Sequence, residues 1–172
     1  MLRRPLLSAF FVAAACFMPS VAQTVDADSL RAALMAEEMA MNAPGRMAAD
    51  FRLMLADGAE SRLSHFRGAP LLLVLFDPDC DDCLRALDKL PEKVPHGMAV
   101  LAVYADGDMS VWPRALVAVP QGWTAALDLD GVYSSGMYSP EFTPGIYLLD
   151  AEGRVIARGA DAFSSSGGKR VP

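Results

Sequence analysis

Two cysteines with two residues between them lie where a strongly apolar run gives way to a helical pattern. The run over residues 71–76, Leu-Leu-Leu-Val-Leu-Phe, predicts a strand buried on both faces. The segment that follows carries leucines at the spacing of one helix face, at Leu84, Leu87 and Leu90. Cys80 therefore lies at the start of the predicted helix, where unpaired N–H groups and the helix dipole stabilise a thiolate, and Cys83 lies one turn further in. This placement is typical of cysteines that exchange disulfides.

The first 22 residues have the three-part pattern of a secretory signal. Arg3 and Arg4 make the start positive, residues 6–18 are almost wholly apolar, and residues 20–22 are Ser-Val-Ala, with small side chains before a cleavage after Ala22. The apolar stretch is short for a bilayer span, which argues against a membrane anchor. We therefore expect an exported protein of the periplasm or cell envelope.

Cys16 leaves a second interpretation of this segment open. Ala14 and Ala15 are the small residues that a lipoprotein signal places before its lipidated cysteine. Ala13, however, stands where leucine is usual, and cleavage before Cys16 would leave a very short apolar region. The sequence favours removal of Cys16 with the signal, and a lipid anchor at Cys16 is the alternative.

Loss of the signal would leave Cys80 and Cys83 as the only cysteines. An exported chain with a single C-x-x-C has no framework of structural disulfides and no spare thiol. Its 13 basic and 21 acidic side chains would give a net charge of −8, which argues against nucleic acid or an anionic membrane surface as partner. The two histidines, His65 and His96, have no second C-x-x-C to complete a zinc site, and we expect no metal and no cofactor.

The N-terminal part of the expected mature chain predicts one helix and one hairpin. Residues 28–41 form an amphipathic pattern, with Asp28 or Ser29 as N-cap and with apolar residues near one face at Leu30, Leu34, Met35, Met39 and Met41. Residues 42–45, Asn-Ala-Pro-Gly, end it. Two short strands, 51–55 and 61–63, flank the turn Asp57-Gly58.

The rest of the chain alternates strands and helices. After the strand 71–76 and the helix that holds the cysteines, we expect a strand over 98–104, a helix over 110–119 with Pro113 in its first turn, and strands over 123–127, 145–149 and 154–160. This order predicts an α/β fold with a central mixed sheet and helices on its faces. We divide the chain into a signal peptide (1–22), an N-terminal helix and linker (23–45), one domain (46–162) and a disordered tail (163–172).

Several motifs together resemble the thioredoxin-like superfamily, and within it the exported TlpA/ResA-like branch, from about residue 50 to residue 160. They are Asp50-Phe51 before the hairpin, Leu-Ser-His-Phe-Arg-Gly at 63–68, the C-x-x-C, and Phe-Thr-Pro-Gly-Ile-Tyr-Leu-Leu-Asp at 142–150. The resemblance implies a thioredoxin-like fold with an N-terminal hairpin and an extra N-terminal helix. It also implies a thiol–disulfide oxidoreductase without a cofactor.

The resemblance assigns further roles. It implies that the Thr143–Pro144 bond is cis and faces the cysteine pair, where it helps to bind a substrate. Because Cys80 begins the helix nearer to solvent, we expect it to attack, and we expect Cys83 to resolve the mixed disulfide. The partners would be exported proteins that contain cysteine, and a membrane thiol donor would supply electrons.

The sequence departs from the family pattern in three places. Asp79 stands before Cys80 where many thioredoxins have tryptophan, and Val74 stands where thioredoxin has a buried acid. The closing helix after residue 160 is absent or very short, so we expect the helix 28–41 to cover that face of the sheet instead.

The charges around the first cysteine are expected to tune its thiolate. The carboxylates of Asp77, Asp79, Asp81 and Asp82 oppose the helix dipole, with Arg85 as the nearest cation in sequence. A surface contact between a carboxylate and a thiolate costs on the order of 1 kcal/mol, so several of them offset much of the dipole's benefit. A destabilised thiolate predicts a reductase-like pair rather than a strong oxidant.

Other interpretations of the sequence were weighed against a catalytic cysteine pair. The pair could be an inert disulfide in a non-catalytic binding module, with Asp81 and Asp82 serving only to cap the helix. A peroxiredoxin-like peroxidase is disfavoured because Asp77-Pro78-Asp79, and not a pattern that begins with a hydroxyl, precedes Cys80. Residues 128–131 match only part of a calcium loop and are interpreted as a turn.

Overall fold

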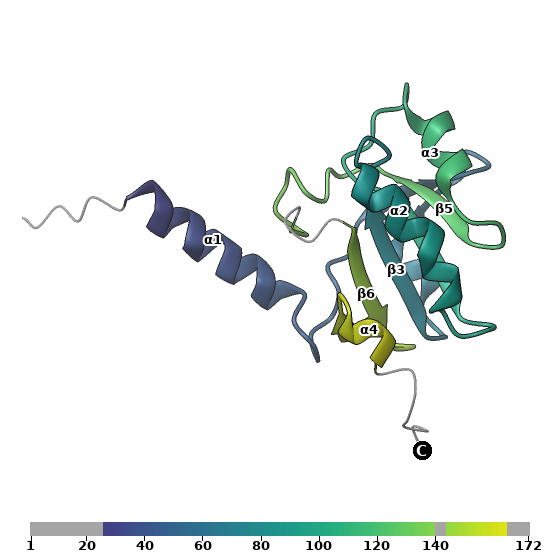
Figure 1. The fold of residues 1–172 in the computed structure, drawn as a ribbon. Helices are drawn as coiled ribbons and strands as arrows, with labels where there is room; N and C mark the ends of the chain where they lie inside the picture. The colour runs from purple at the N-terminus through teal and green to yellow at the C-terminus, as the bar shows by residue number, and fades with distance from the viewer. Residues whose placement is uncertain (1–25, 140–143, 165–172) are drawn as a thin grey trace, which may run out of the picture.

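The computed structural model describes residues 26–139 and 144–164. Its centre is a seven-stranded sheet with the order β2-β1-β5-β4-β3-β6-β7 (Figure 1). The strands are β1 (Arg52–Leu55), β2 (Glu60–Arg62), β3 (Leu71–Phe76), β4 (Ala99–Tyr104), β5 (Thr124–Asp128), β6 (Gly145–Leu149) and β7 (Val155–Arg158). The helices are α1 (Ala27–Met41), α2 (Asp81–Lys89), α3 (Trp112–Ala118) and α4 (Asp161–Ser164), with short 3-10 turns η1 (Leu63–Phe66) and η2 (Leu90–Glu92).

The middle of the sheet is parallel and its borders are antiparallel. β3, β4 and β5 run in one direction and are joined through α2 and α3, as parallel neighbours require. β6 runs against β3, β1 runs against β5, and the outer strands β2 and β7 complete two hairpins. All six residues of β3 are buried, which explains why this strand is apolar throughout rather than alternating. The predicted mixed sheet flanked by helices is confirmed.

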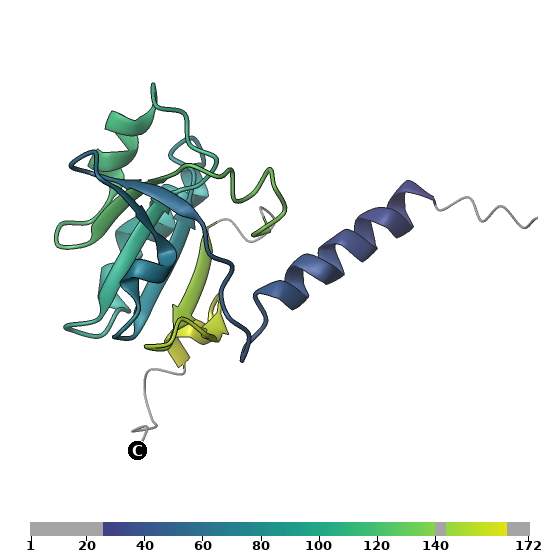
Figure 2. The ribbon, with the colours of Figure 1, turned by 180° about the vertical axis from the view of Figure 1, so that it is seen from behind.

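The two faces of the sheet are covered in different ways. One face packs against the described helices α2, α3 and α4 through Leu87, Trp112 and Ala162. The other packs against loop residues such as Phe51, Leu63 and Tyr138. Figure 1 shows α2 and α4 before the sheet, and Figure 2 shows the hairpin β1–β2 on the reverse side.

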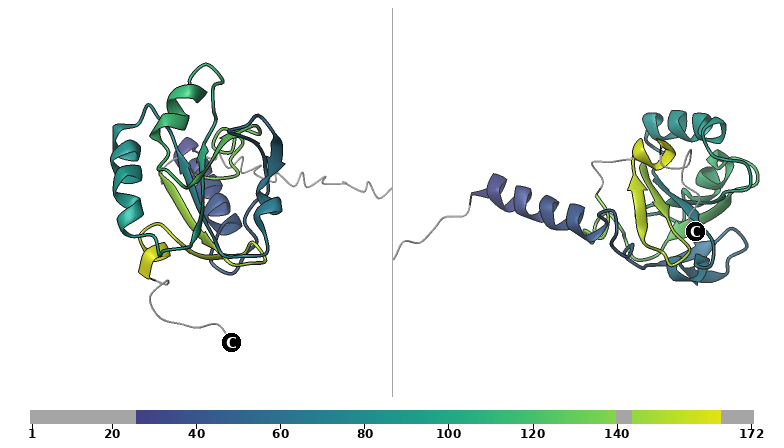
Figure 3. Two further views of the ribbon diagram at one scale, coloured as in Figure 1. Left: turned by 90° about the vertical axis from the view of Figure 1, so that its right-hand side faces the viewer. Right: turned by 90° about the horizontal axis from the view of Figure 1, so that it is seen from below.

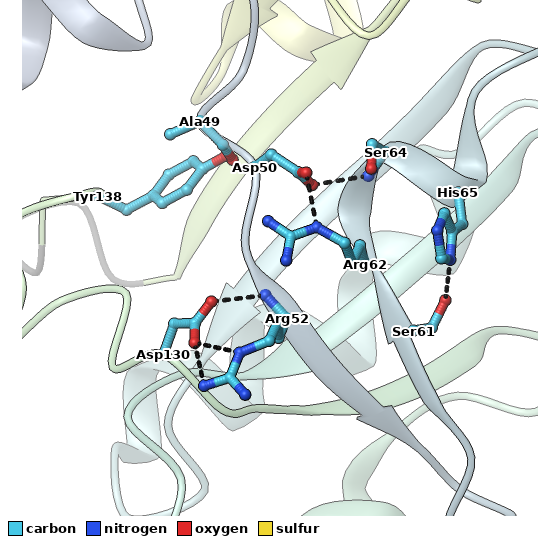
Figure 4. A network of polar contacts seen from close by, with 9 residues as sticks. All are labelled: Ala49, Asp50, Arg52, Ser61, Arg62, Ser64, His65, Asp130 and Tyr138. Atoms are coloured by element: carbon cyan, nitrogen blue, oxygen red, sulfur yellow. Dashed lines mark hydrogen bonds and ion pairs between the residues drawn. The ribbon is translucent and has the colours of Figure 1, made fainter.

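Two ion pairs fix the N-terminal hairpin, one within it and one to the segment after β5 (Figure 4). Asp50 accepts hydrogen bonds from Arg62 Nε at 2.9 Å and from the Ser64 N–H at 2.9 Å, and these bonds lower its pKa although burial opposes them. Asp130, just after β5, accepts from the backbone N–H of Arg52 at 2.8 Å and from its guanidinium. This stretch therefore joins two segments of the fold, and since Asp128 is the last residue of β5 the interpretation of residues 128–131 as a turn is wrong at that residue.

α1 extends away from the domain (Figure 3). Its N-cap is Asp26, whose side chain accepts the Ser29 N–H at 2.6 Å, so the expected cap at Asp28 or Ser29 is wrong. Leu30 and Met41 are 53% and 40% exposed, and the expectation that this helix covers the sheet is wrong as well. The described part of the closing helix, α4, has four residues, and the residues that follow it lie outside the described part of the chain. Within the described chain no helix is both long and apolar enough to span a bilayer.

α1 is nevertheless fixed where it ends. Its C-cap, Asn42, is 2% exposed. The side-chain amide donates to the carbonyl of Met137 at 2.7 Å and accepts from the N–H of Ala49 at 3.0 Å. The expected signal peptide (1–22), Cys16 and most of the expected tail lie outside the described residues, and α4 reaches Ser164.

Candidate active site

The cysteines lie at the edge of the sheet where three parallel strands end. β3 ends at Phe76, β4 at Tyr104 and β5 at Asp128, so the loops that follow them meet at this edge. β6 runs in the opposite direction and begins here, with Gly145 paired to Leu75. Pro144 therefore enters the sheet beside the end of β3, close to the start of α2. Thr143 lies outside the described residues.

Cys80 is the N-cap of α2. Its backbone is extended, with φ −96° and ψ 106°, and its Sγ accepts the Cys83 N–H at 3.2 Å. The turn before it is held by Asp77, whose carbonyl accepts the Cys80 N–H at 3.2 Å and whose carboxylate accepts the Asp79 N–H at 2.8 Å. A half-buried sulfur in this position faces the positive end of the helix dipole. Both cysteines are free thiols in the structure.

Cys83 is more deeply buried than Cys80. It is fully buried and packs in the cluster that contains Val74 and Leu87. Burial, with the contact to Cys80, raises the pKa of Cys83 from 9.0 to about 12. Val74, on the strand that packs against Cys83, is fully buried and has only methyl groups, so it cannot accept a proton from the thiol. Cys83 therefore keeps its proton at neutral pH.

The exposed carboxylates near Cys80 are partly neutralised by two arginines. Asp82 pairs with Arg85 one turn along α2, and this contact raises the pKa of Arg85. Asp79 pairs with Arg114, which comes from the first turn of α3. Arg114 was not among the predicted site residues because it lies 35 positions after Asp79 in the sequence. Only the folded arrangement of β3, α2, β4 and α3 brings the two side chains together, and no local sequence pattern indicates it.

A second group of carboxylates lies beside the first, after β4 and β5. Asp106 accepts the N–H groups of Tyr133 and Ser134, both at 2.8 Å, and has φ +52°, a left-handed conformation that aspartate tolerates better than most residues. Asp128 is 3% exposed and accepts three backbone N–H groups, from Asp106, Asp130 and Val132. Burial raises the pKa of Asp128, while these three hydrogen bonds oppose the rise.

Two hollows adjoin the cysteine pair. One, of about 420 Å³, is lined by acidic and aromatic residues: Asp77, Asp79, Asp106, Tyr104 and Tyr133. The other, of about 790 Å³, runs along α2 and includes Asp82, Arg85 and Pro144. Of the described residues predicted for the site, Pro144 lines the same hollow as Asp82 and Arg85, and the others lie at or directly before the start of α2: Asp79, Cys80, Asp81 and Cys83. In residues 26–139 and 144–164 no three His, Cys, Asp or Glu side chains form a candidate metal site.

This arrangement can attack a disulfide. One sulfur is open to solvent and lies at a helix N-terminus, and a second lies within reach behind it and carries a proton. A hollow on each side leaves room for the chain that carries the target sulfur.

Comparisons with known proteins agree with this fold. No protein-family model matches the sequence, and no curated protein matches it. Among solved structures, a conserved protein of unknown function from Bacteroides fragilis is 31% identical with a TM-score of 0.62, over 72% of this chain and 98% of that one. A thioredoxin-like protein from Bacteroides caccae is 24% identical with a TM-score of 0.69, over 80% of this chain and 53% of that one. The thioredoxin domain of a thiol-disulfide oxidoreductase from Bacteroides vulgatus is 21% identical with a TM-score of 0.59, over 72% of this chain and 95% of that one.

Proposed function

We propose that this chain, whose fold is thioredoxin-like, is a thiol–disulfide oxidoreductase that works through Cys80 and Cys83. The observation that carries the proposal is the asymmetry of the pair. Cys80 caps α2 and is partly open to solvent, while Cys83 is buried behind it and donates its backbone N–H to the first sulfur. A disulfide that only stabilises the fold does not require its two sulfurs to differ in exposure in this way.

The reaction follows from that difference. The Cys80 thiolate attacks one sulfur of a partner disulfide, forming a mixed disulfide and releasing the other partner sulfur as a thiolate, which takes up a proton. Cys83 then loses its proton, attacks Cys80 Sγ and releases the second partner sulfur. The net result is a Cys80–Cys83 disulfide and two partner thiols, so two electrons pass to the partner. Because the pKa of Cys83 is raised to about 12, deprotonation of this thiol is the step that needs help from the bound partner or from water.

The proposed direction is reduction of the partner. Asp81 and Asp82 lie in the first turn of α2, and Asp79 lies directly before Cys80. These negative charges oppose a thiolate, although Arg85 and Arg114 moderate the effect of two of them. A less stabilised thiolate makes the dithiol a better reductant.

The setting is the cell envelope. The pattern of residues 1–22 supports export, with the TlpA/ResA-like branch as the nearest group by motif. Partners would be exported proteins with oxidised cysteines, and a membrane thiol donor would restore the Cys80–Cys83 dithiol. The acidic chain supports no role in nucleic-acid binding.

The proposal is tested by insulin reduction and by trapping. Residues 23–172 should reduce insulin disulfides in the presence of a thiol donor, and Cys80→Ser should abolish this activity. Cys83→Ser should instead accumulate a mixed disulfide with the partner, because the resolving thiol is missing.

The reduction potential decides the direction. Equilibration with a glutathione buffer should give a value of about −270 mV or lower, while a value near about −120 mV would make the protein an oxidant. A pair that never equilibrates with the buffer, and a partner interaction that survives in Cys80→Ser, would identify a non-catalytic binding module and refute the proposed enzyme.

A further inference from the structure

We infer that the groove along α2 selects acidic partners: it docks an acidic polypeptide segment that also carries apolar side chains and lies next to the partner's reactive cysteine. This inference rests on the proposed function and adds the chemistry of the substrate to it. Four features of the described residues support it: the walls of the groove, its row of cations, its apolar floor and the acidic charge of the surface around it.

The groove lies between α2 and the segment that follows β7. Its lining comes from α2 on one side and from Gly159, Ala160 and Phe163 on the other, with Pro144 and Ile146 of the β6 segment between them. The hollow between these walls has a volume of about 790 Å³ and reaches Asp82, the neighbour of Cys83 in the first turn of α2.

Three cations line the helical wall of the groove. Arg85 and Lys89 lie one turn apart on α2, Lys93 directly follows η2, and all three line the groove. At 1.5 Å per residue along α2 and about 2 Å per residue along the 3-10 turn, the row is about 14 Å long, which matches about four residues of an extended chain. Asp82 is the one carboxylate in the lining, and it is paired with Arg85. The net charge of the groove is therefore positive.

The floor between these cations is apolar. Leu90, Ile146 and Phe163 line it, and the ammonium of Lys93 lies 5.9 Å from the centre of the Phe163 ring. An apolar floor with a cationic wall fits a segment that places carboxylates on one side and aliphatic or aromatic side chains on the other.

The rest of the surface makes this row of cations distinctive. The chain has 21 acidic and 15 basic residues, and the hollow on the other side of Cys80 contains Asp77, Asp79 and Asp106. A partner with an acidic segment is therefore attracted on the α2 side and repelled on the other, which fixes the direction in which it crosses the cysteines. An acidic partner is favoured over a basic one at the groove, despite the negative charge of the whole protein.

Chromogenic peptides test the inference. Three peptides of equal length carry one cysteine as a mixed disulfide with thionitrobenzoate, with Glu, Gln or Lys alternating with Leu on one side of it and Ser alternating with Gly on the other. The reduced protein converts each mixed disulfide to a free peptide thiol and free thionitrobenzoate while forming its own disulfide, and colour release gives the rate. At low ionic strength we expect the Glu peptide to react about 10-fold faster than the Lys peptide, since several exposed charge pairs add up.

Matched variants locate the preference. Lys89→Gln with Lys93→Gln should reduce the ratio of the two rates to about 2-fold. Arg46→Gln with Arg67→Gln removes the same charge from exposed sites outside the groove and should leave the ratio unchanged. Equal loss in both double variants would show a net-charge effect and overturn the inference.

Other results are equally decisive. Equal rates for all three peptides, or a preference for Lys, would overturn the groove assignment while the proposed oxidoreductase stands. Failure with every peptide and with insulin would instead refute the proposed function. A wild-type dimer that becomes monomeric in the Lys89/Lys93 variant would show that a second copy fills the groove, which would also overturn the inference.

Discussion

Two neighbouring groups of aspartates at one edge of the sheet use the same side chain in opposite ways. In the group after β4 and β5, Asp128 is 3% exposed and its carboxylate is surrounded by backbone N–H groups. In the group around Cys80, Asp79 and Asp82 are mostly exposed and pair with arginine side chains. The first group fixes backbone, and the second places charge near a sulfur.

Burial separates the carboxylates that maintain the fold from those that act on the sulfur. A buried carboxylate that loses its partners leaves unpaired polar groups in the interior, so replacing it destabilises the fold. An exposed pair contributes little to stability because water screens it, so it can be changed to adjust a redox site without loss of the fold. The contrast is testable, and the expected effects decrease from the interior to the surface.

Replacement of Asp128 by alanine should have the largest effect. Three backbone N–H groups would lose their acceptor at a buried position, and we expect a loss of about 3 kcal/mol in the free energy of unfolding. Urea unfolding measures it. Asp79→Ala is the matched control and should cost less than about 1 kcal/mol. Comparable losses in the two variants would contradict the division proposed here.

The same contrast between buried and exposed positions separates the two thiols and predicts a dependence on pH. The fold raises the pKa of Cys83 from 9.0 to about 12, so between these values the unfolded chain releases a proton that the native state retains. This contribution to stability is complete below pH 9 and is lost as the pH rises toward 12. Unfolding of the reduced wild type should therefore become easier over this range than unfolding of reduced Cys83→Ala. Parallel pH curves for the two proteins would show that the thiol is not shielded.

Arg114 tests the exposed group. Arg114→Gln leaves the Asp79 carboxylate unpaired beside Cys80, which destabilises the thiolate and should make the pair more reducing. We expect about a threefold shift in the equilibrium with glutathione, equivalent to about 15 mV, with little change in stability. Asp79→Asn should shift the equilibrium in the opposite direction. The double variant should lie close to the Asp79→Asn value, because Arg114 acts through that carboxylate.

Asp81 should show the smallest effect. It is exposed in the first turn of α2, where its negative charge interacts favourably with the helix dipole and unfavourably with a thiolate at Cys80. Asp81→Asn should change the free energy of unfolding by less than about 0.5 kcal/mol and make the pair slightly more oxidising. A stability change as large as that of Asp128→Ala would place Asp81 among the structural carboxylates.

The sequence predicted those parts of the molecule whose local pattern decides the structure. β3 was predicted with its observed bounds because a strand buried on both faces is apolar at every position. The cysteine pair was placed correctly at the start of α2 for a similar reason, since the change from strand to helical spacing is local. The N-cap of α1 was misplaced because Asp26, Asp28 and Ser29 all have side chains that can cap, and composition does not choose between them.

Other features depend on contacts that the chain order conceals. Asp128 was interpreted as part of a turn, and nothing nearby in the sequence signals that its carboxylate is buried beneath three N–H groups. Arg114 joins the site only through the packing of α3 beside the loop after β3. The row of cations is visible in the sequence at 85, 89 and 93, but only the fold shows that these residues line a hollow with Pro144 and Ile146.

The buried Asn42 sets the point at which the anchored part of the domain begins. Its side-chain amide donates to the carbonyl of Met137 and accepts from the N–H of Ala49, so one residue connects the end of α1 to the segment before β1 and to the stretch after β5. Replacing this side chain would take the hydrogen-bond partner from both backbone groups at once. The domain is therefore closed on its N-terminal side ahead of its first strand, β1.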